Sequence, residues 1–515
     1  MPRAAAEADL TIVGGRTLPG ILRDGAARHP DRELLVFDAL DGRIATYTWA
    51  EVLACARALA AQLAGAGVGR GDAVHVHLAN RPEFLFAWFA AGELGARIVP
   101  TNTAASSSEV AYIVAHARAA VSLTDGAGLA TVRAATAGTV LDCDHDLDLD
   151  GGPPDAAAPA AVGPLDDLAV MYTSGTTSRP KGVRVTHANY VYAGETVAAG
   201  LGLRPEDRSL VVLPLFHANA QYYSTMGMLV RGGTIVLAAR FTASGYADLA
   251  IRHRATVGSL FAAPIRMILA QHERPHWRDH GLRVVAYAQN ITEAEHARWD
   301  AVMGAPLLQL YGMTETIGPP LMNPLPGPRR HDAIGRPVLG YACRIVRPDG
   351  SAIDEDGVPG ELHVAGTPGL SLMAGYLRDE EATGATLADG WLRTGDLVRR
   401  DADGLLTFVG RTRDMIKRAG ENVAAGEVEE VLIDHPAVLD AAVVGVPDAM
   451  RDEKIVAFVV LADGQSADEE ELRAWCSTRL ARFRVPSHVA IQHELPRTPV
   501  GKIQKHLLQA AWREP

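Results

Sequence analysis

The stretch Tyr172-Thr-Ser-Gly-Thr-Thr-Ser-Arg-Pro-Lys-Gly182 is the most informative segment of the sequence. It follows the apolar residues 168–171, and it offers hydroxyl groups, a glycine and Lys181. Hydroxyls, close-approaching backbone N–H groups and a cation are what a polyphosphate needs. It is not a Walker loop, because Pro180 precedes Lys181 and Gly182 follows it. A hydroxyl-rich surface turn would look similar in isolation, so the other motifs of the chain must decide.

Four further motifs follow this segment. They are Tyr311-Gly-Met-Thr-Glu315, Gly390-Trp-Leu-Arg-Thr-Gly-Asp396, Gly410-Arg-Thr-Arg-Asp-Met-Ile-Lys-Arg-Ala-Gly-Glu-Asn422 and Pro499-Val-Gly-Lys502. In this order the five motifs resemble the phosphate, adenylate, ribose, hinge and C-terminal lysine motifs of the adenylate-forming superfamily. That superfamily includes acyl-CoA synthetases, peptide-synthetase adenylation domains and firefly luciferase. The chain is therefore identified as a member, most similar to bacterial acyl-CoA ligases.

Composition restricts the partners. The 515 residues suffice for about three domain-sized units. Lys and Arg number 49 against 61 Asp and Glu, a net charge of −12, whereas nucleic acids and anionic membranes favour a surplus of Lys and Arg. No apolar run of about 20 residues predicts a membrane span, and residues 1–15 lack the apolar run of a signal peptide. We therefore expect no nucleic-acid or membrane partner and a cytoplasmic location. The cysteines, Cys55, Cys143, Cys343 and Cys476, show no zinc or redox spacing.

The order of predicted elements indicates an α/β fold. Strands and helices alternate through the first 310 residues or so, which favours parallel sheets covered by helices. Closely spaced turns between residues 334 and 408 predict a smaller β-rich lobe. Helices mixed with a few strands follow. We predict a large N-terminal domain, residues 1–412, that holds the acyl and ATP sites, and a small mobile α+β C-terminal domain, residues 413–515.

The resemblance implies a two-step reaction with ATP/AMP, Mg²⁺ and CoA as cofactors. A carboxylate attacks the α-phosphate of ATP to give an acyl-adenylate and pyrophosphate, and a thiol then displaces AMP. The residues it implies for the phosphates are Thr173, Ser174, Gly175, Thr176, Thr177, Lys181 and, at the α-phosphate, Thr314. Those it implies around the metal and nucleoside are Glu315 on Mg²⁺, Tyr311 against adenine with Gly312 and Met313 beside it, and Asp396 and Arg411 on the ribose.

The C-terminal motifs imply a moving domain. Lys502 would bridge the substrate carboxylate and the α-phosphate, and Arg413 occupies the hinge position. After rotation, the loop with Lys417 and Gly420 would line the thiol tunnel, where Gly420 leaves space for pantetheine.

The segment Pro214-Leu-Phe-His-Ala-Asn-Ala-Gln221 bears on the acid. The resemblance places His217 at the acyl pocket, with Gly312 also near the substrate. Amino-acid-activating relatives usually carry an Asp near here, and this stretch has none, so we expect a carboxylic acid other than a free amino acid. Asn219 and Gln221 are candidates for binding a hydroxyl or carbonyl. This segment most resembles that of carnitine- and crotonobetaine-type CoA ligases, although no Asp or Glu that would pair with a trimethylammonium group is evident.

Three positions depart from the family pattern. Ser178 stands in the phosphate loop and Arg413 at the hinge, both mild changes. Ala288-Gln-Asn-Ile291 replaces the usual Gly-Gly-Ala or Gly-Ala-Ala turn, so Gln289 and Asn290 would lie on the adenine side of the site. If they narrow it, the chain would be an enzyme of one half-reaction, which mainly forms the thioester.

Two more functions are compatible with the motifs. One is a ligase that acylates a carrier protein, and the other is a non-catalytic nucleotide-binding regulatory protein, although a pure binder has little need of Lys502.

His75 and His77 are the remaining candidates for metal ligands. They alternate on a predicted strand over residues 72–78, so both would face the same side of it. No third ligand lies near them in the sequence, and we therefore expect packed strand residues rather than metal ligands.

Overall fold

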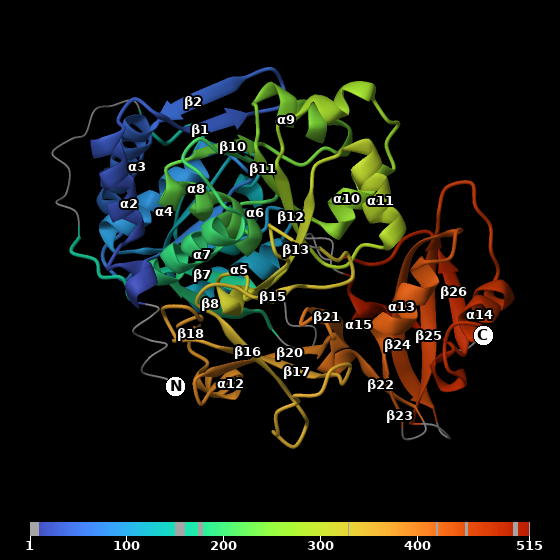
Figure 1. Ribbon diagram of the computed structural model, residues 1–515. Coiled ribbons are helices and arrows are strands. Elements are labelled where there is room, and N and C mark those ends of the chain that lie inside the picture. Colours follow the sequence, from blue (N-terminus) through green and yellow to red (C-terminus); the bar gives the residue numbers. More distant parts are fainter. Residues whose placement is uncertain are drawn as a thin grey trace.

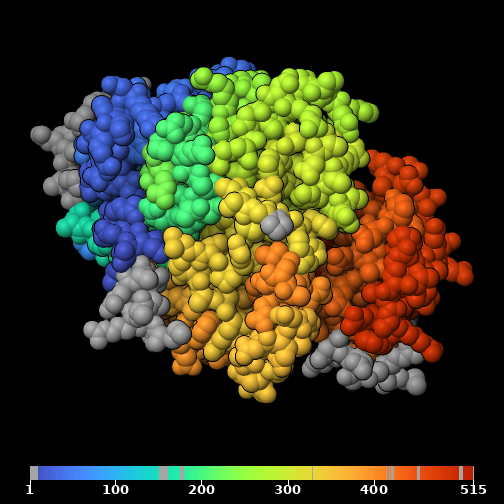
Figure 2. Space-filling model, viewed as in Figure 1, coloured from blue at the N-terminus to red at the C-terminus, as the bar shows by residue number. Residues whose placement is uncertain are grey.

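The computed structural model describes residues 10–149, 160–173, 179–327, 329–418, 421–448, 452–497 and 503–513. Figure 1 shows a large N-terminal part made of helix-covered sheets, a strand-rich lobe beneath it, and a smaller C-terminal unit at one side. The α/β class and the small α+β C-terminal unit are therefore confirmed. The C-terminal unit rests against the larger part in Figure 2.

Two large sheets, both mainly parallel, form the N-terminal part. The first has nine strands in the order β15-β14-β13-β12-β11-β9-β10-β1-β2, and the second has seven in the order β18-β8-β7-β4-β3-β5-β6. The strands of the first are β1 (Glu33–Asp38), β2 (Ile44–Thr48), β9 (Arg208–Val211), β10 (Thr234–Ala238), β11 (Val257–Phe261), β12 (Val284–Ala288), β13 (Leu307–Tyr311), β14 (Leu321–Met322) and β15 (Arg336–Pro337). Those of the second are β3 (Ala73–His77), β4 (Arg97–Pro100), β5 (Ala119–Thr124), β6 (Thr139–Asp142), β7 (Asp167–Thr173), β8 (Lys181–Thr186) and β18 (Gly375–Tyr376).

Helices surround these sheets (Figure 1). Thr48 with Glu51, and Ser106 with Glu109, form the capping boxes that begin two of them. The helices of this part are α2 (Leu18–Arg28), α3 (Trp49–Gly65), α4 (Pro82–Leu94), α5 (Ser107–Ala117), α6 (Leu129–Ala135), α7 (His187–Gly200), α8 (Met226–Arg231), α9 (Tyr246–Arg252), α10 (Ala262–Leu269) and α11 (Glu293–Val302).

The lobe and the C-terminal unit each contain a five-stranded sheet. The lobe holds β16 (Ala342–Val346), β17 (Gly360–Ala365), β19 (Leu387–Ala388), β20 (Trp391–Arg400), β21 (Leu406–Arg411) and helix α12 (Glu380–Thr386). The C-terminal unit holds β22 (Met415–Arg418), β23 (Glu421–Ala424), β24 (Val438–Asp448), β25 (Asp452–Leu461), β26 (His488–Gln492) and helices α13 (Ala425–Ile433), α14 (Glu469–Ser477) and α15 (Lys505–Ala511).

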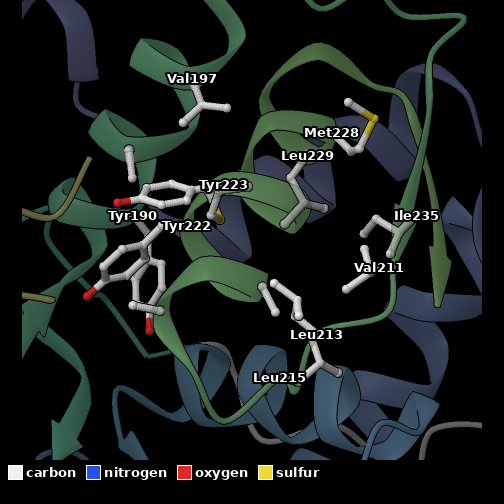
Figure 3. Packing of buried hydrophobic residues seen from close by; sticks show 14 of the residues in the cluster. Tyr190, Val197, Val211, Leu213, Leu215, Tyr222, Tyr223, Met228, Leu229 and Ile235 are labelled. Atoms are coloured by element: carbon white, nitrogen blue, oxygen red, sulfur yellow. The ribbon is translucent and has the colours of Figure 1, made fainter. Parts of the chain in front are cut away.

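The apolar cores follow the same division. One continuous core draws its buried residues from Val13 to Leu406, and a separate one begins at Ile416. Figure 3 shows part of the large core, where the rings of Tyr190 and Tyr222 lie together with centroids 5.5 Å apart. The change of core falls between residues 406 and 416, around the predicted boundary at 412/413, which stays a prediction.

His75 and His77 are packed strand residues, as expected. Both are fully buried on β3, and both rings hydrogen-bond to the hydroxyl of Thr101 at 2.8 Å. Burial lowers the pKa of His75 to about 3, so this ring is neutral. Among the described residues, no helix is both long and apolar enough to cross a membrane.

Candidate active site

The phosphate segment connects the two strands of a β-hairpin, β7 and β8. β7 ends at Thr173 and β8 begins at Lys181, and these two residues lie opposite each other in the antiparallel ladder. Thr173 and Lys181 therefore lie on neighbouring strands of the seven-stranded sheet. Residues 174–178, which include the predicted Ser174, Gly175, Thr176 and Thr177, lie outside the described part.

Three predicted nucleotide residues from three motifs lie together, and two of them contact the carboxylate of the third, Asp396. The Tyr311 hydroxyl donates to Asp396 Oδ2 at 2.6 Å, and Arg411 Nε lies 3.0 Å from Asp396 Oδ1. Asp396 is 4% exposed, so its charge is compensated by Arg411 within the protein. Burial, followed by the charge of Asp396, raises the pKa of Tyr311 well above its usual value, so the phenol keeps its proton. Gly312 and Met313 follow Tyr311 at the end of β13 and are half-buried.

Glu315 is joined to the phosphate hairpin through a residue that no sequence motif singles out. The Tyr376 hydroxyl donates to Glu315 Oε1 at 3.0 Å. The Lys181 ammonium nitrogen lies 5.0 Å from the centroid of the same ring. The predicted metal residue and the predicted phosphate lysine therefore share one aromatic neighbour.

The turn after Glu315 is strained. Thr314, half-buried, begins the short 3₁₀ turn Thr314–Thr316, and Ile317 follows with φ 67° and ψ −82°. A β-branched residue rarely adopts positive φ, so surrounding contacts must impose it. The Tyr341 hydroxyl supplies two of them, because it donates to the Thr316 carbonyl at 2.7 Å and accepts from Gly318 N at 2.9 Å. Tyr341 therefore fixes the turn that carries Thr314 and Glu315.

The predicted acyl residues lie at the start of a π-helix, Asn219–Thr225. π-Helical turns are rare and are frequent at functional sites. The His217 ring makes an edge contact with Phe261 at 5.7 Å, and Asn219 Oδ1 accepts from Ser259 Oγ at 2.9 Å. Asn219 Nδ2 is buried and has no hydrogen-bond partner within the part of the chain that the structure describes.

Gln221 has a different environment. Its Oε1 accepts from the Tyr190 hydroxyl at 2.5 Å, and its Nε2 donates to the Leu215 carbonyl at 2.6 Å. The side chain is fully buried. Both polar ends are therefore engaged inside the protein, and the predicted contact of Gln221 with substrate receives no support from its surroundings.

The altered loop after β12, residues 288–291, contains a residue with positive φ. Gln289 has φ 74°, in the left-handed region that glycine adopts without strain. Both Gln289 and Asn290 are exposed, and Asn290 Oδ1 accepts from Gln309 Nε2 at 2.9 Å. The left-handed backbone at this position explains why relatives have a glycine here. In this chain a glutamine adopts the same strained backbone conformation.

The hinge segment is anchored on both sides. Arg411 is paired with Asp396 of the lobe, while Lys505 Nζ of the C-terminal unit lies 2.7 Å from Glu429 and 3.8 Å from Asp414. Arg413 lies between these anchors, in the short turn Thr412–Asp414. Lys417 is on β22, whereas Gly420 and Lys502 lie outside the described residues.

Comparison with known proteins agrees with this geometry. A family model described as AMP-binding enzyme matches residues 22–377, and one for the AMP-binding enzyme C-terminal domain matches residues 427–502. The chain therefore belongs to the AMP-binding enzyme family.

Its relatives narrow the activity. It is 35% identical to a crotonobetaine/carnitine–CoA ligase of Citrobacter koseri, covering 97% of this chain and 100% of that one. Among solved structures, ATP-bound MatB from Rhodopseudomonas palustris superposes with a TM-score of 0.87 at 27% identity, over 96% of this chain and 98% of that one. A benzoate CoA ligase from Burkholderia xenovorans gives 0.87 at 29% identity, over 96% and 100%.

This protein is accordingly an AMP-forming acyl-CoA ligase. It activates a carboxylic acid with ATP to an acyl-adenylate and transfers the acyl group to CoA. A non-catalytic regulatory role is set aside, because relatives matched over their whole length are named ligases.

Proposed function

We propose that the acid carries a hydrogen-bond acceptor, such as a hydroxyl or carbonyl oxygen, on its acyl chain. The observation that carries this proposal is the buried Asn219 Nδ2, which has no partner among the described residues. Leaving a buried donor unpaired costs about 1–3 kcal/mol, so a substrate oxygen that accepts from it would gain selectivity. Ser259 fixes the other end of the amide and so orients the donor.

A betaine-type acid is the second candidate, since the Citrobacter koseri relative is named for crotonobetaine and carnitine. The His217 and Phe261 rings form an aromatic pair at this end of the site. Aromatic faces bind quaternary ammonium groups without a carboxylate. Carnitine would satisfy both features, because it has a hydroxyl as well as the trimethylammonium group.

A panel of matched acids tests the two candidates. We expect 3-hydroxybutanoate to exceed butanoate, or carnitine to exceed its deoxy analogue, by about tenfold or more in kcat/KM for acyl-CoA formation. The variant Asn219→Leu, which keeps the branched shape of the side chain and removes its polar atoms, should abolish that preference, while Ser259→Ala should reduce it. Equal rates within each pair, in the native enzyme and in Asn219→Leu, would contradict the proposed acceptor.

The nucleotide roles are proposed from the clustering above. Lys181 and the hairpin loop hold the β- and γ-phosphates, Thr314 the α-phosphate, Tyr311 the adenine, and Asp396 with Arg411 the ribose. Glu315 fits a magnesium ion, because it is a buried carboxylate and oxygen is the ligand that this hard cation prefers. When bound, the ion supplies positive charge to the phosphates.

The first step needs fixed positive charge where the carboxylate meets the α-phosphate. We assign this role to Lys502, whose ammonium offsets the negative charge that gathers on both groups as they approach. Pyrophosphate leaves, and the thiol of CoA then attacks the acyl carbonyl and displaces AMP. A carrier-protein thiol in place of CoA stays a prediction, tested by adding a pantetheinylated carrier protein to the same assay.

Rotation of the C-terminal unit would separate the two steps. The anchors at Arg411 and Asp414 leave only Thr412 and Arg413 between them, so the pivot is confined to these two residues. In the second pose, the loop with Lys417 and Gly420 would replace Lys502 beside the acyl-adenylate.

A further inference from the structure

Tyr376 is held in place by the sheet that carries the phosphate hairpin. β18 pairs with β8, so Tyr376 lies opposite Val183, and Leu377 N donates to the Gly182 carbonyl at 2.7 Å. The Tyr376 amide donates to Thr383 Oγ1 at 2.9 Å. Strand β8 and helix α12 thus fix the backbone of Tyr376. Its partner on β8, Val183, is two residues from Lys181.

The side chain of Tyr376 reaches two motifs that are 134 positions apart in the sequence, at Lys181 and Glu315. Its hydroxyl donates to Glu315 Oε1 at 3.0 Å, and its ring lies 5.0 Å from the Lys181 ammonium. The ring is 9% exposed.

We propose that Tyr376 is a positioning residue that fixes the Glu315 carboxylate and the Lys181 ammonium relative to each other, so that ATP and its metal ion enter a preformed site. The inference rests on the roles proposed above for Glu315 and Lys181. A hydrogen bond to one carboxylate oxygen sets the orientation of the whole group. The electron-rich ring face favours the ammonium at one place along the flexible lysine chain. The two effects belong to different atoms and can be removed separately.

Two variants separate them. Tyr376→Phe removes the hydroxyl and keeps the ring, whereas Tyr376→Leu removes both. Tyr246→Phe is the matched control, because Tyr246 is a buried tyrosine whose hydroxyl has no hydrogen-bond partner among the described residues. A thermal melt of each variant establishes that it is folded.

The primary measurement is ATP binding by calorimetry at several magnesium concentrations, with no acid present. We expect Tyr376→Phe to weaken ATP binding about tenfold at low magnesium and by less than about twofold at saturating magnesium. Tyr376→Leu should weaken it by about a further fivefold at every magnesium concentration. CoA transfer from supplied acyl-adenylate should stay within about twofold for both, because that substrate has no β- or γ-phosphate.

Native ATP binding by Tyr376→Phe at low magnesium would overturn the proposal, and so would an equal loss of ATP binding and CoA transfer in that variant. The variants Glu315→Gln and Lys181→Met distinguish a failure of the role proposed for Tyr376 from a failure of the roles proposed for Glu315 and Lys181. If these two variants weaken ATP binding while Tyr376→Phe does not, only the role of Tyr376 is wrong. If all three bind ATP as the native enzyme does, the proposed roles of Glu315 and Lys181 are wrong as well.

Discussion

The nucleotide side and the acyl side of the site are built differently. On the nucleotide side, Asp396 accepts a hydrogen bond from Tyr311 and pairs with Arg411. Glu315 accepts a hydrogen bond from Tyr376. The carboxylates on this side therefore have partners within the protein. On the acyl side, Asn219 keeps a buried amide donor that has no hydrogen-bond partner among the described residues. ATP is the same in every turnover of every relative, whereas the acid varies. Within the site, the amide of Asn219 is therefore the group with which we propose that this chain selects its own acid.

The largest effect should come from Lys502→Ala. Loss of the ammonium group that we propose to bridge the carboxylate and the α-phosphate should slow acyl-adenylate formation by about 10³-fold, because the negative charge that gathers there is then less compensated. Thioester formation from supplied acyl-adenylate should change by less than about threefold. Pyrophosphate exchange and single-turnover CoA transfer measure the two steps, and Arg513→Ala, which removes an exposed cation of the same unit, serves as the control. An equal loss in both steps would show that Lys502 has another role.

The second-largest effect should come from Asp396→Ala, which should weaken ATP binding. It removes the partner of the Tyr311 hydroxyl and leaves the Arg411 charge without its counter-ion, so ATP affinity should fall about 10²-fold. The affinity for the acid, measured from its KM at saturating ATP, should change little, because Asp396 contacts Tyr311 and Arg411, which are both proposed nucleotide residues. A fall of the same size in both affinities would contradict the separation of the two sides.

Arg413→Pro should act on the movement between the steps. Proline fixes its own φ and restricts Thr412, and these are the two residues left between the anchors. We expect overall turnover to fall about twentyfold while one half-reaction keeps at least half its native rate. Arg413→Ala, which leaves the backbone free, is the control. Unchanged turnover of Arg413→Pro would mean that the pivot lies elsewhere.

The sequence predicts that Tyr311, Asp396 and Arg411 share one site, because the chemistry demands particular residue types in order, and the structure brings the three together. Their roles toward ATP stay predictions. The pairing of Tyr376 with this site cannot be predicted from the sequence, since it depends on β18 meeting β8 across nearly two hundred residues. The π-helix cannot be predicted either, because its run of residues has no period that separates it from an α-helix. The environment of Gln221 is hidden for a related reason: its partner Tyr190 lies on another helix, and only packing brings them together.

Gln289→Gly should give the smallest effect. The left-handed backbone costs a non-glycine residue about 1–2 kcal/mol, and glycine gives back about 0.5–1 kcal/mol through its greater freedom when unfolded. The melting temperature should therefore rise by about 1 °C, and Gln289→Ala should give no rise. The KM for ATP should stay within about twofold. A fall in that KM of about tenfold or more would show that the native side chain obstructs adenine, as an enzyme of one half-reaction requires.

Acid-dependent exchange of pyrophosphate into ATP, followed by CoA-thioester formation in the same sample, tests the central claim most directly. If one site performs both steps, the preferred acid of the matched panel should support exchange, and added CoA should then yield the acyl-CoA with release of one AMP per thioester. No exchange with any acid of the panel, together with fast CoA transfer from supplied acyl-adenylate, would contradict the claim and leave thioester formation as the activity of this chain.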